Sequence, residues 1–187
     1  MIAAANLTSH FLIAMPSLRD PNFSRTVTYI CEHSERGAMG IVLNRPSELS
    51  LGDVLTHMKI PDAPAELGRQ PVYLGGPVES ERGFVLHTTT TPWSSTLKVT
   101  DEISVTTSRD VLEAMARGTG PRRFLVALGY AGWAGGQLEG ELQENAWLSG
   151  PADERIIFDL PADERWTAAA RLLGVDLTLI SSEAGHA

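Results

Sequence analysis

The sequence contains a single cysteine, Cys31, so no disulfide can form within the chain, and this favours a reducing compartment. Its apolar runs all fall short of the roughly 18 residues that a membrane-spanning helix needs. The first residues also lack the basic and apolar regions of a signal peptide. The sequence therefore predicts a cytoplasmic protein without a membrane segment.

Basic residues are few and scattered along the chain. The 187 residues include 15 Lys and Arg against 23 Asp and Glu, which gives a formal net charge of −8. Only Arg122 and Arg123 are adjacent. Because contacts to nucleic-acid phosphates need clustered basic side chains, direct DNA binding is disfavoured.

Residues 124–148 are the stretch around which the rest of the chain is organised. Residues 124–130 (FLVALGY) are apolar on both faces, which is typical of a central strand. Glycines then interrupt the apolar run. Residues 137–145 place Leu138 and Leu142 on one side, which predicts a short helix.

The rest of the chain alternates short apolar runs with turn residues. The runs predict strands at residues 10–15, 27–31, 40–44, 72–74, 83–87, 97–99, 103–106, 147–148, 156–158 and 177–180. Four short helices are predicted to begin near Ser50, Ser108, Gln137 and Pro161, and Asp53 completes a capping box with Ser50. Since hairpins dominate, we predict one domain over residues 1–187, of the α+β class, with a mainly antiparallel sheet.

A tetrapeptide, Ser-Glu-Arg-Gly, occurs at residues 34–37 and again at 80–83, each time before an apolar strand. The repeat suggests two similar hairpins side by side, although four residues of turn composition also recur by coincidence. In the first hairpin, strand alternation places Cys31 and His33 on one face and Glu32 on the other. The apolar neighbours of Cys31 predict a buried, unreactive thiol.

Several blocks of the sequence, in the same order, resemble the YqgE/AlgH family of bacterial proteins. The blocks are residues 10–18 (HFLIAMPSL), 31–33 (CEH), 37–46 (GAMGIVLNRP), 75–78 (GGPV), 82–87 (RGFVLH), 128–139 (LGYAGWAGGQLE) and the ending at 185–187 (GHA). Ala134-Gly135 stands where Gly-Ala is usual in that family. The resemblance implies an α+β fold with a barrel-like antiparallel sheet. Some members of the family are described as regulators of transcription, and the family supplies no agreed catalytic residues.

Two histidines at strand ends, His33 and His87, are the candidate catalytic residues. If the two hairpins are neighbours, both imidazoles could open onto one cleft with Glu32, Asp20 and Asn44, an arrangement suited to proton transfer. The alternative is that each histidine hydrogen-bonds a nearby loop and stabilises a turn. No metal-ligand spacing such as HExxH is present, so no metal and no cofactor is predicted.

Two glycine-rich segments are candidate ligand-binding elements, since glycine lets a ligand approach the backbone. They contain Gly75 and Gly76, and Gly135 and Gly136 next to Gln137, at whose helix start an anion is attracted. Tight turns that need positive φ explain the same glycines, and we favour that interpretation. Neither segment fits a nucleotide-binding motif.

Arg45 and Arg82 lie beside the two matching strands, with Asn44 next to the first. Together the two arginines could hold a carboxylate or a phosphate. Solvated arginines in turns are the alternative.

These patterns favour a non-enzymatic regulatory or binding module over an enzyme. It would act through a protein partner or a small anionic ligand, as a monomer or a homodimer, and affect transcription indirectly. The alternative is a hydrolase-like enzyme that uses the cleft of His33, His87, Glu32 and Asp20.

Overall fold

The computed structural model describes residues 6–88 and 92–184, with side chains described as far as Ile180. The family-like ending at residues 185–187 lies outside the described residues. Within them, one sheet contains ten strands: β1 (His10–Ala14), β2 (Val27–Ser34), β3 (Gly37–Val42), β4 (Pro46–Ser50), β5 (Pro71–Leu74), β6 (Val78–Thr88), β7 (Thr96–Lys98), β8 (Ile103–Thr106), β9 (Phe124–Ala134) and β10 (Trp147–Pro151).

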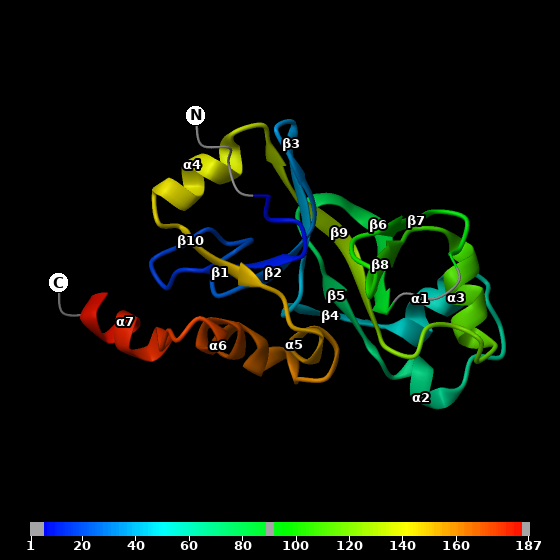
Figure 1. Ribbon diagram of the computed structural model, residues 1–187. Helices are drawn as coiled ribbons and strands as arrows, with labels where there is room; N and C mark the ends of the chain where they lie inside the picture. Colours follow the sequence, from blue (N-terminus) through cyan, green and yellow to red (C-terminus); the bar gives the residue numbers. More distant parts are fainter. Residues whose placement is uncertain (1–5, 89–91, 185–187) are drawn as a thin grey trace.

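Strand β9 is the centre of this sheet, as its two-sided apolar pattern predicts. The strand order is β10-β1-β2-β3-β9-β6-β8-β7, and β5 also pairs with β9, in parallel, while β4 pairs with β5. The first half of β9 pairs with β5 and β6, and its second half pairs with β3. Strand β9 therefore joins two parts of the molecule that are distant in sequence (Figure 1).

The sheet is mainly antiparallel and curls into a half-barrel, so the predicted α+β fold is confirmed. The described residues contain seven helices: α1 (Leu51–His57), α2 (Ala65–Gly68), α3 (Arg109–Ala116), α4 (Gln137–Gln143), α5 (Glu154–Phe158), α6 (Ala162–Leu172) and α7 (Leu177–Ala184). The four predicted helices are α1, α3, α4 and α6.

Three apolar clusters attach the helices to the sheet. One contains α5 and α6 with residues of β1 to β3, β5, β6, β8 and β9. A second packs α1 and α3 on β5, β6 and β9, and a third packs α4 on β9 and β10. Helix α4 is held further by Glu141, whose Oε1 accepts hydrogen bonds from the indole N–H groups of Trp133 (3.1 Å) and Trp147 (3.0 Å). The three groups of helices thus cover different parts of the curled sheet (Figure 1).

Two predicted strands are wrong, because residues 156–158 and 177–180 lie in helices α5 and α7. Each helix starts beside an aspartate whose side chain accepts a backbone N–H: Asp153 from Arg155 (2.8 Å) and Asp176 from Thr178 (2.9 Å). A short apolar run has the same composition in a strand and in a buried helix turn. The caps decide between the two conformations here.

The β2–β3 hairpin contains a bulge at Cys31. Ile30 pairs with Gly40 and Glu32 pairs with Met39, so Cys31 is an extra residue in β2. A bulge of this kind reverses the facing of the side chains that follow it. The predicted shared face of Cys31 and His33 is therefore wrong: Cys31 joins the core beneath α5 and α6, whereas His33 faces Leu7 and α4.

Strand β6 contains a larger irregularity opposite β9. Val78 pairs with Tyr130 and Gly83 with Leu128, so residues 79–82 stand opposite Gly129 alone. Glu79, the first residue of this bulge, has a positive φ of 46°. The second Ser-Glu-Arg-Gly tetrapeptide thus forms a bulge within a strand, whereas the first forms the predicted turn.

Candidate functional site

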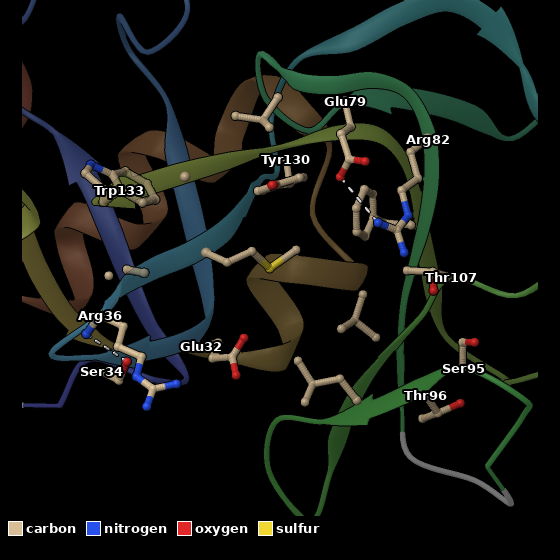
Figure 2. A pocket seen from close by; sticks show the side chains of 18 of the residues that line it. Glu32, Ser34, Arg36, Glu79, Arg82, Ser95, Thr96, Thr107, Tyr130 and Trp133 are labelled. Atoms are coloured by element: carbon tan, nitrogen blue, oxygen red, sulfur yellow. Dashed lines mark hydrogen bonds and ion pairs between the residues drawn. The ribbon is translucent and has the colours of Figure 1, made fainter. Parts of the chain in front are cut away.

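A trough with a volume of about 940 Å³ lies between the β2–β3 hairpin and strands β6, β7 and β8, with β9 behind it (Figure 2). Its apolar surface is formed by Met39, Val78, Phe84, Leu97, Val105 and Tyr130. Phe84 and Val105 belong to the core beneath α5 and α6, and Met39 and Tyr130 pack against that core. The trough is therefore an open continuation of the apolar interior.

Four charged side chains line the trough, two on each wall. Glu32 and Arg36 come from the β2–β3 hairpin, and Glu79 and Arg82 come from the bulge of β6 (Figure 2). Arg82 Nη1 lies 3.3 Å from Glu79 Oε2, and both side chains are about half exposed. The Arg82 guanidinium also lies 5.5 Å from the centre of the Phe84 ring. The β2–β3 hairpin and the bulge of β6 thus bring opposite charges to both sides of one apolar hollow.

Hydroxyl groups complete the lining at the end of the trough near β7. Ser94, Ser95 and Thr96 lie at the start of β7, and Thr107 follows β8. No histidine or cysteine lines the trough within the described residues.

His33 is part of a structural hydrogen-bond pair that connects three segments. The backbone N–H of Leu7 donates to His33 Nδ1 at 2.9 Å, so Nδ1 carries no proton, and Nε2–H donates to Glu139 Oε1 at 2.5 Å. This hydrogen bond is the main cause that lowers the pKa of Glu139 below its ordinary value. Both nitrogens of His33 are therefore engaged in linking β2 to α4 and to the N-terminal segment.

His87 is buried on the opposite side of β6 from the trough and belongs to a chain of hydrogen bonds. Its Nε2 lies 2.7 Å from Thr106 Oγ1, which lies 2.8 Å from Thr96 Oγ1, and Trp93 N–H donates to Thr96 Oγ1 at 3.0 Å. The other nitrogen of His87, Nδ1, lies 2.9 Å from the carbonyl of Thr88. A neutral His87 satisfies every one of these groups, so the ring stabilises the junction of β6, β7 and β8.

The burial of His87 predicts a pH dependence of stability. Desolvation lowers the pKa of His87 in the folded chain below its ordinary value near 6.5, so the unfolded chain binds a proton at a higher pH than the folded chain. The contribution of neutral His87 to the free energy of unfolding is complete above the pKa that His87 has in the unfolded chain. It is lost as the pH falls towards the lower pKa that His87 has in the folded chain. Between about pH 7.5 and about pH 5.5 this loss reaches at most about 1.4 kcal/mol.

Urea unfolding at these two pH values measures the effect. We expect His87→Gln to lose this part of the pH dependence. The variant His57→Gln, which changes an exposed histidine, should keep it. An unchanged pH dependence in His87→Gln would contradict the account.

Three further candidate residues, Asp20, Asn44 and Arg45, form hydrogen bonds within or to the loop before β2. Asp20 Oδ1 accepts the N–H of Asn22 at 2.8 Å, and Asn44 Oδ1 accepts the N–H of Val27 at 3.0 Å. Arg45 donates to the carbonyls of Pro21 (2.5 Å) and Ser24 (2.8 Å). Asp20, Asn44 and Arg45 therefore stabilise the same loop and do not line the trough.

Three of the candidate glycines are explained by close packing. A Cβ on Gly75 or Gly76 would overlap the backbone of β9, and a Cβ on Gly135 would lie 2.6 Å from the carbonyl oxygen of Glu35. Gly136 has a φ of 81° with open space around it, and the side chain of Gln137 accepts the N–H of Ala134 at 3.0 Å. Gly76 and Gly136 have the positive φ that tight turns require, whereas Gly75 and Gly135 are required by close backbone packing.

The buried thiol of Cys31 is the remaining reactive group. Burial is the main cause that raises the pKa of Cys31 to about 12. A protonated thiol is a poor nucleophile and a poor metal ligand. The described residues contain no group of three or more His, Cys, Asp or Glu side chains arranged for a metal ion. They also contain no helix long and apolar enough to cross a membrane.

The structure thus brings together two of the candidate residues, Glu32 and Arg82, on the walls of the trough, and it does not bring the two histidines to one point. Arg36 and Glu79 were missed from the sequence. The repeated tetrapeptide was the available signal, since its two arginines, Arg36 and Arg82, face the same trough (Figure 2).

The sequence matches one protein-family model and is similar to several known bacterial proteins. A family model described as AlgH-like matches residues 11–178. A UPF0301 protein of Thioalkalivibrio sulfidiphilus is 60% identical over 187 residues, which cover all of both chains. A UPF0301 protein of Pseudomonas aeruginosa is 57% identical over 183 residues, which cover 97% of this chain and 96% of that protein.

Two solved structures are similar over most of their length. The solution structure of the AlgH protein from Pseudomonas aeruginosa matches with a TM-score of 0.80 and 54% identity, covering 100% of this chain and 99% of that one. A crystal structure of a protein from Corynebacterium diphtheriae matches with a TM-score of 0.71 and 22% identity, covering 91% of this chain and 89% of that one. At this identity the second match concerns the fold alone.

Proposed function

The chain belongs to the AlgH-like family, and we propose that it is a non-enzymatic binding module that recognises a segment of a partner protein in the trough. The observation that carries this proposal is the composition of the trough: a continuous apolar surface with two arginines and two glutamates at its walls. Apolar surface in a concave site supplies affinity, and a few charged groups around it select the partner.

The position of the reactive side chains favours binding over catalysis. General acid–base catalysis needs a titratable group within hydrogen-bond reach of the reacting atoms. His33 and His87 are engaged in hydrogen bonds outside the trough, and Cys31 is buried in the core. The serine and threonine hydroxyls that line the trough have no histidine beside them among its lining residues.

The charge balance supports an indirect effect on any transcription that the module influences. The trough holds equal numbers of acidic and basic side chains, in a chain whose formal net charge is −8. Such a surface suits a protein segment better than a phosphate backbone. We place this activity in the cytoplasm, where the single thiol stays reduced.

Site-specific crosslinking in living cells tests the proposal. A photoreactive residue is placed in the trough by Leu97→p-benzoylphenylalanine. A matched control is Leu49→p-benzoylphenylalanine, since Leu49 is exposed to a similar degree (44% against 39%) but lies on β4, away from the trough. We expect a discrete protein adduct from position 97 that is absent from position 49.

The second variant shows whether the adduct depends on the charges of the trough. Adding Arg36→Glu to the chain labelled at position 97 should abolish the adduct. Equal adducts at the two positions, or an adduct that survives Arg36→Glu, would contradict the proposal. Tight, sequence-selective DNA binding in an electrophoretic assay would also overturn it.

A further inference from the structure

Strand β7 ends the sheet beside the trough and has an unpaired edge. It is the last strand in the order, and within the described residues it pairs only with β8. Thr107 N–H donates to the carbonyl of Ser95, and Val99 N–H donates to the carbonyl of Ile103. Because hydrogen-bonded pairs alternate in an antiparallel ladder, the backbone groups of Thr96 and Lys98 point away from β8. No backbone partner is seen for these groups among residues 6–88 and 92–184, so an added strand could bond to them.

The side chains of β7 show which face of an added strand would enter the trough. The side chains of Leu97 and its cross-strand partner Val105 line the trough, whereas the hydroxyl group of Thr96, at the end of the trough, bonds to Thr106 Oγ1 and through it to His87. A residue of an added strand that lies opposite Leu97 would share the face of Leu97. Its side chain, and those two residues before and after it, would therefore point into the trough.

The cations around the trough indicate the charge of the added segment. Arg36 has no ion pair among the described residues, whereas Arg82 is paired with Glu79. Lys98, at the free edge, is also paired, since its Nζ lies 3.0 Å from Asp101 Oδ1. Glu32 stands on the same wall as Arg36 and would repel a second carboxylate. This arrangement fits a segment with one acidic group.

We propose that the trough receives an extended peptide segment of a partner protein by strand addition to β7. Apolar side chains at alternate positions lie on Met39, Phe84 and Tyr130, and one carboxylate pairs with Arg36. The inference rests on the proposed function and specifies how the partner is held. Strand addition supplies affinity through main-chain hydrogen bonds, and the alternate side chains supply specificity. Since β7 has only three residues, the ladder is short and the complex should exchange readily.

Selection from a random heptapeptide phage library on the immobilised full chain supplies the probe. We expect enriched peptides to carry apolar residues at alternate positions and one Asp or Glu in the same alternation. Synthetic copies of the most enriched peptide are then methylated at one backbone amide at a time. Methylation at every second amide should weaken binding about tenfold, and methylation at the amides between them should change it by less than about twofold.

Two protein variants connect the peptide to this site. Arg36→Glu should weaken binding about tenfold, because the carboxylate loses its partner and meets a like charge. The matched control Arg122→Glu changes an exposed arginine outside the trough and should leave binding unchanged. Replacing the acidic residue of the peptide by its amide should remove the difference between wild type and Arg36→Glu.

The outcomes separate this inference from the proposed function. The selected peptides could bind in an Arg36-dependent way without any alternation in the methylation series. That result would keep the trough as the binding site but overturn strand addition. Selection that yields no peptide dependent on Arg36, together with no adduct at position 97, would overturn both. Adducts at position 97 without alternation in the selected sequences would overturn the inference alone.

Discussion

Replacing Gly76 with alanine should destabilise the fold by about 4 kcal/mol or more, or prevent folding altogether. Gly76 connects β5 to β6 with a φ of 155°, and a Cβ there would overlap the carbonyl group of Tyr130 in β9. The clash involves two backbone segments, so no side chain can rotate to relieve it. Urea unfolding followed by the fluorescence of the four tryptophans measures the loss.

Gly136→Ala is the matched control for this prediction. Gly136 also has a positive φ, 81°, but a Cβ there meets no atom within 4 Å. Only the backbone preference of glycine is lost, and we expect a cost of about 1 kcal/mol. Similar small losses in the two variants would show that packing does not require Gly76, and a ligand-binding role for Gly75 and Gly76 would regain support.

Replacing Arg165 with methionine should cost about 3 kcal/mol of unfolding free energy. Arg165 is only 5% exposed, and it attaches α6 to the sheet by donating to the carbonyl of Leu43 at 2.5 Å. It also donates to the carbonyl of Leu160 at 3.0 Å and lies 5.0 Å from the centre of the Tyr73 ring. Methionine keeps much of the side-chain volume but leaves the Leu43 carbonyl without its donor.

The exposed Arg171 on the same helix provides the control. Arg171→Met should change the unfolding free energy by less than about 0.5 kcal/mol, as for other surface substitutions. If Arg165→Met were equally mild, the anchoring of α6 would rest on apolar contacts alone. Chemical denaturation at one pH and one protein concentration compares both variants with the wild type.

Local signals in the sequence predict much of the fold. The two-sided apolar run at residues 124–130 identifies the central strand, and Ser50 with Asp53 identifies the start of α1, where both capping hydrogen bonds are present. The family resemblance carried by separate sequence blocks is confirmed by the AlgH-like match. Each of these features depends on neighbouring residues, so it can be inferred without knowledge of the tertiary contacts.

The bulges could not be predicted because they depend on pairing between distant segments. The extra residue at Cys31 is defined by the register of β2 against β3, and the bulge at residues 79–82 is defined by β6 against Gly129. Strict alternation in β2 gave the wrong face for His33 for this reason. Helices α5 and α7 were predicted as strands because their short apolar runs have the same composition in both conformations, and their caps, Asp153 and Asp176, are the local signal for a helix.

The candidate site was predicted in part. Glu32 and Arg82 line the trough, whereas Asn44 and Arg45 stabilise a loop instead. The trough itself arises because β9 pairs with β3 along one half and with β6 along the other. That arrangement places the β2–β3 hairpin on one side of the hollow and strands β6, β7 and β8 on the other, and no local pattern contains it. The predicted second hairpin is wrong, because β5 and β6 each pair with β9 and, in the described part of the chain, not with each other.

The central claim is that a partner segment binds in the trough, and amide chemical shifts of the full chain titrated with the selected peptide test it most directly. We expect the amides of Met39, Leu97 and Gly132, which come from the two walls and from β9, to shift together and saturate at one peptide concentration. The amide of Gly136 should stay unchanged. Shifts confined to α6 and α7, around the exposed Leu172 and Leu179, would contradict the account and place the interaction elsewhere.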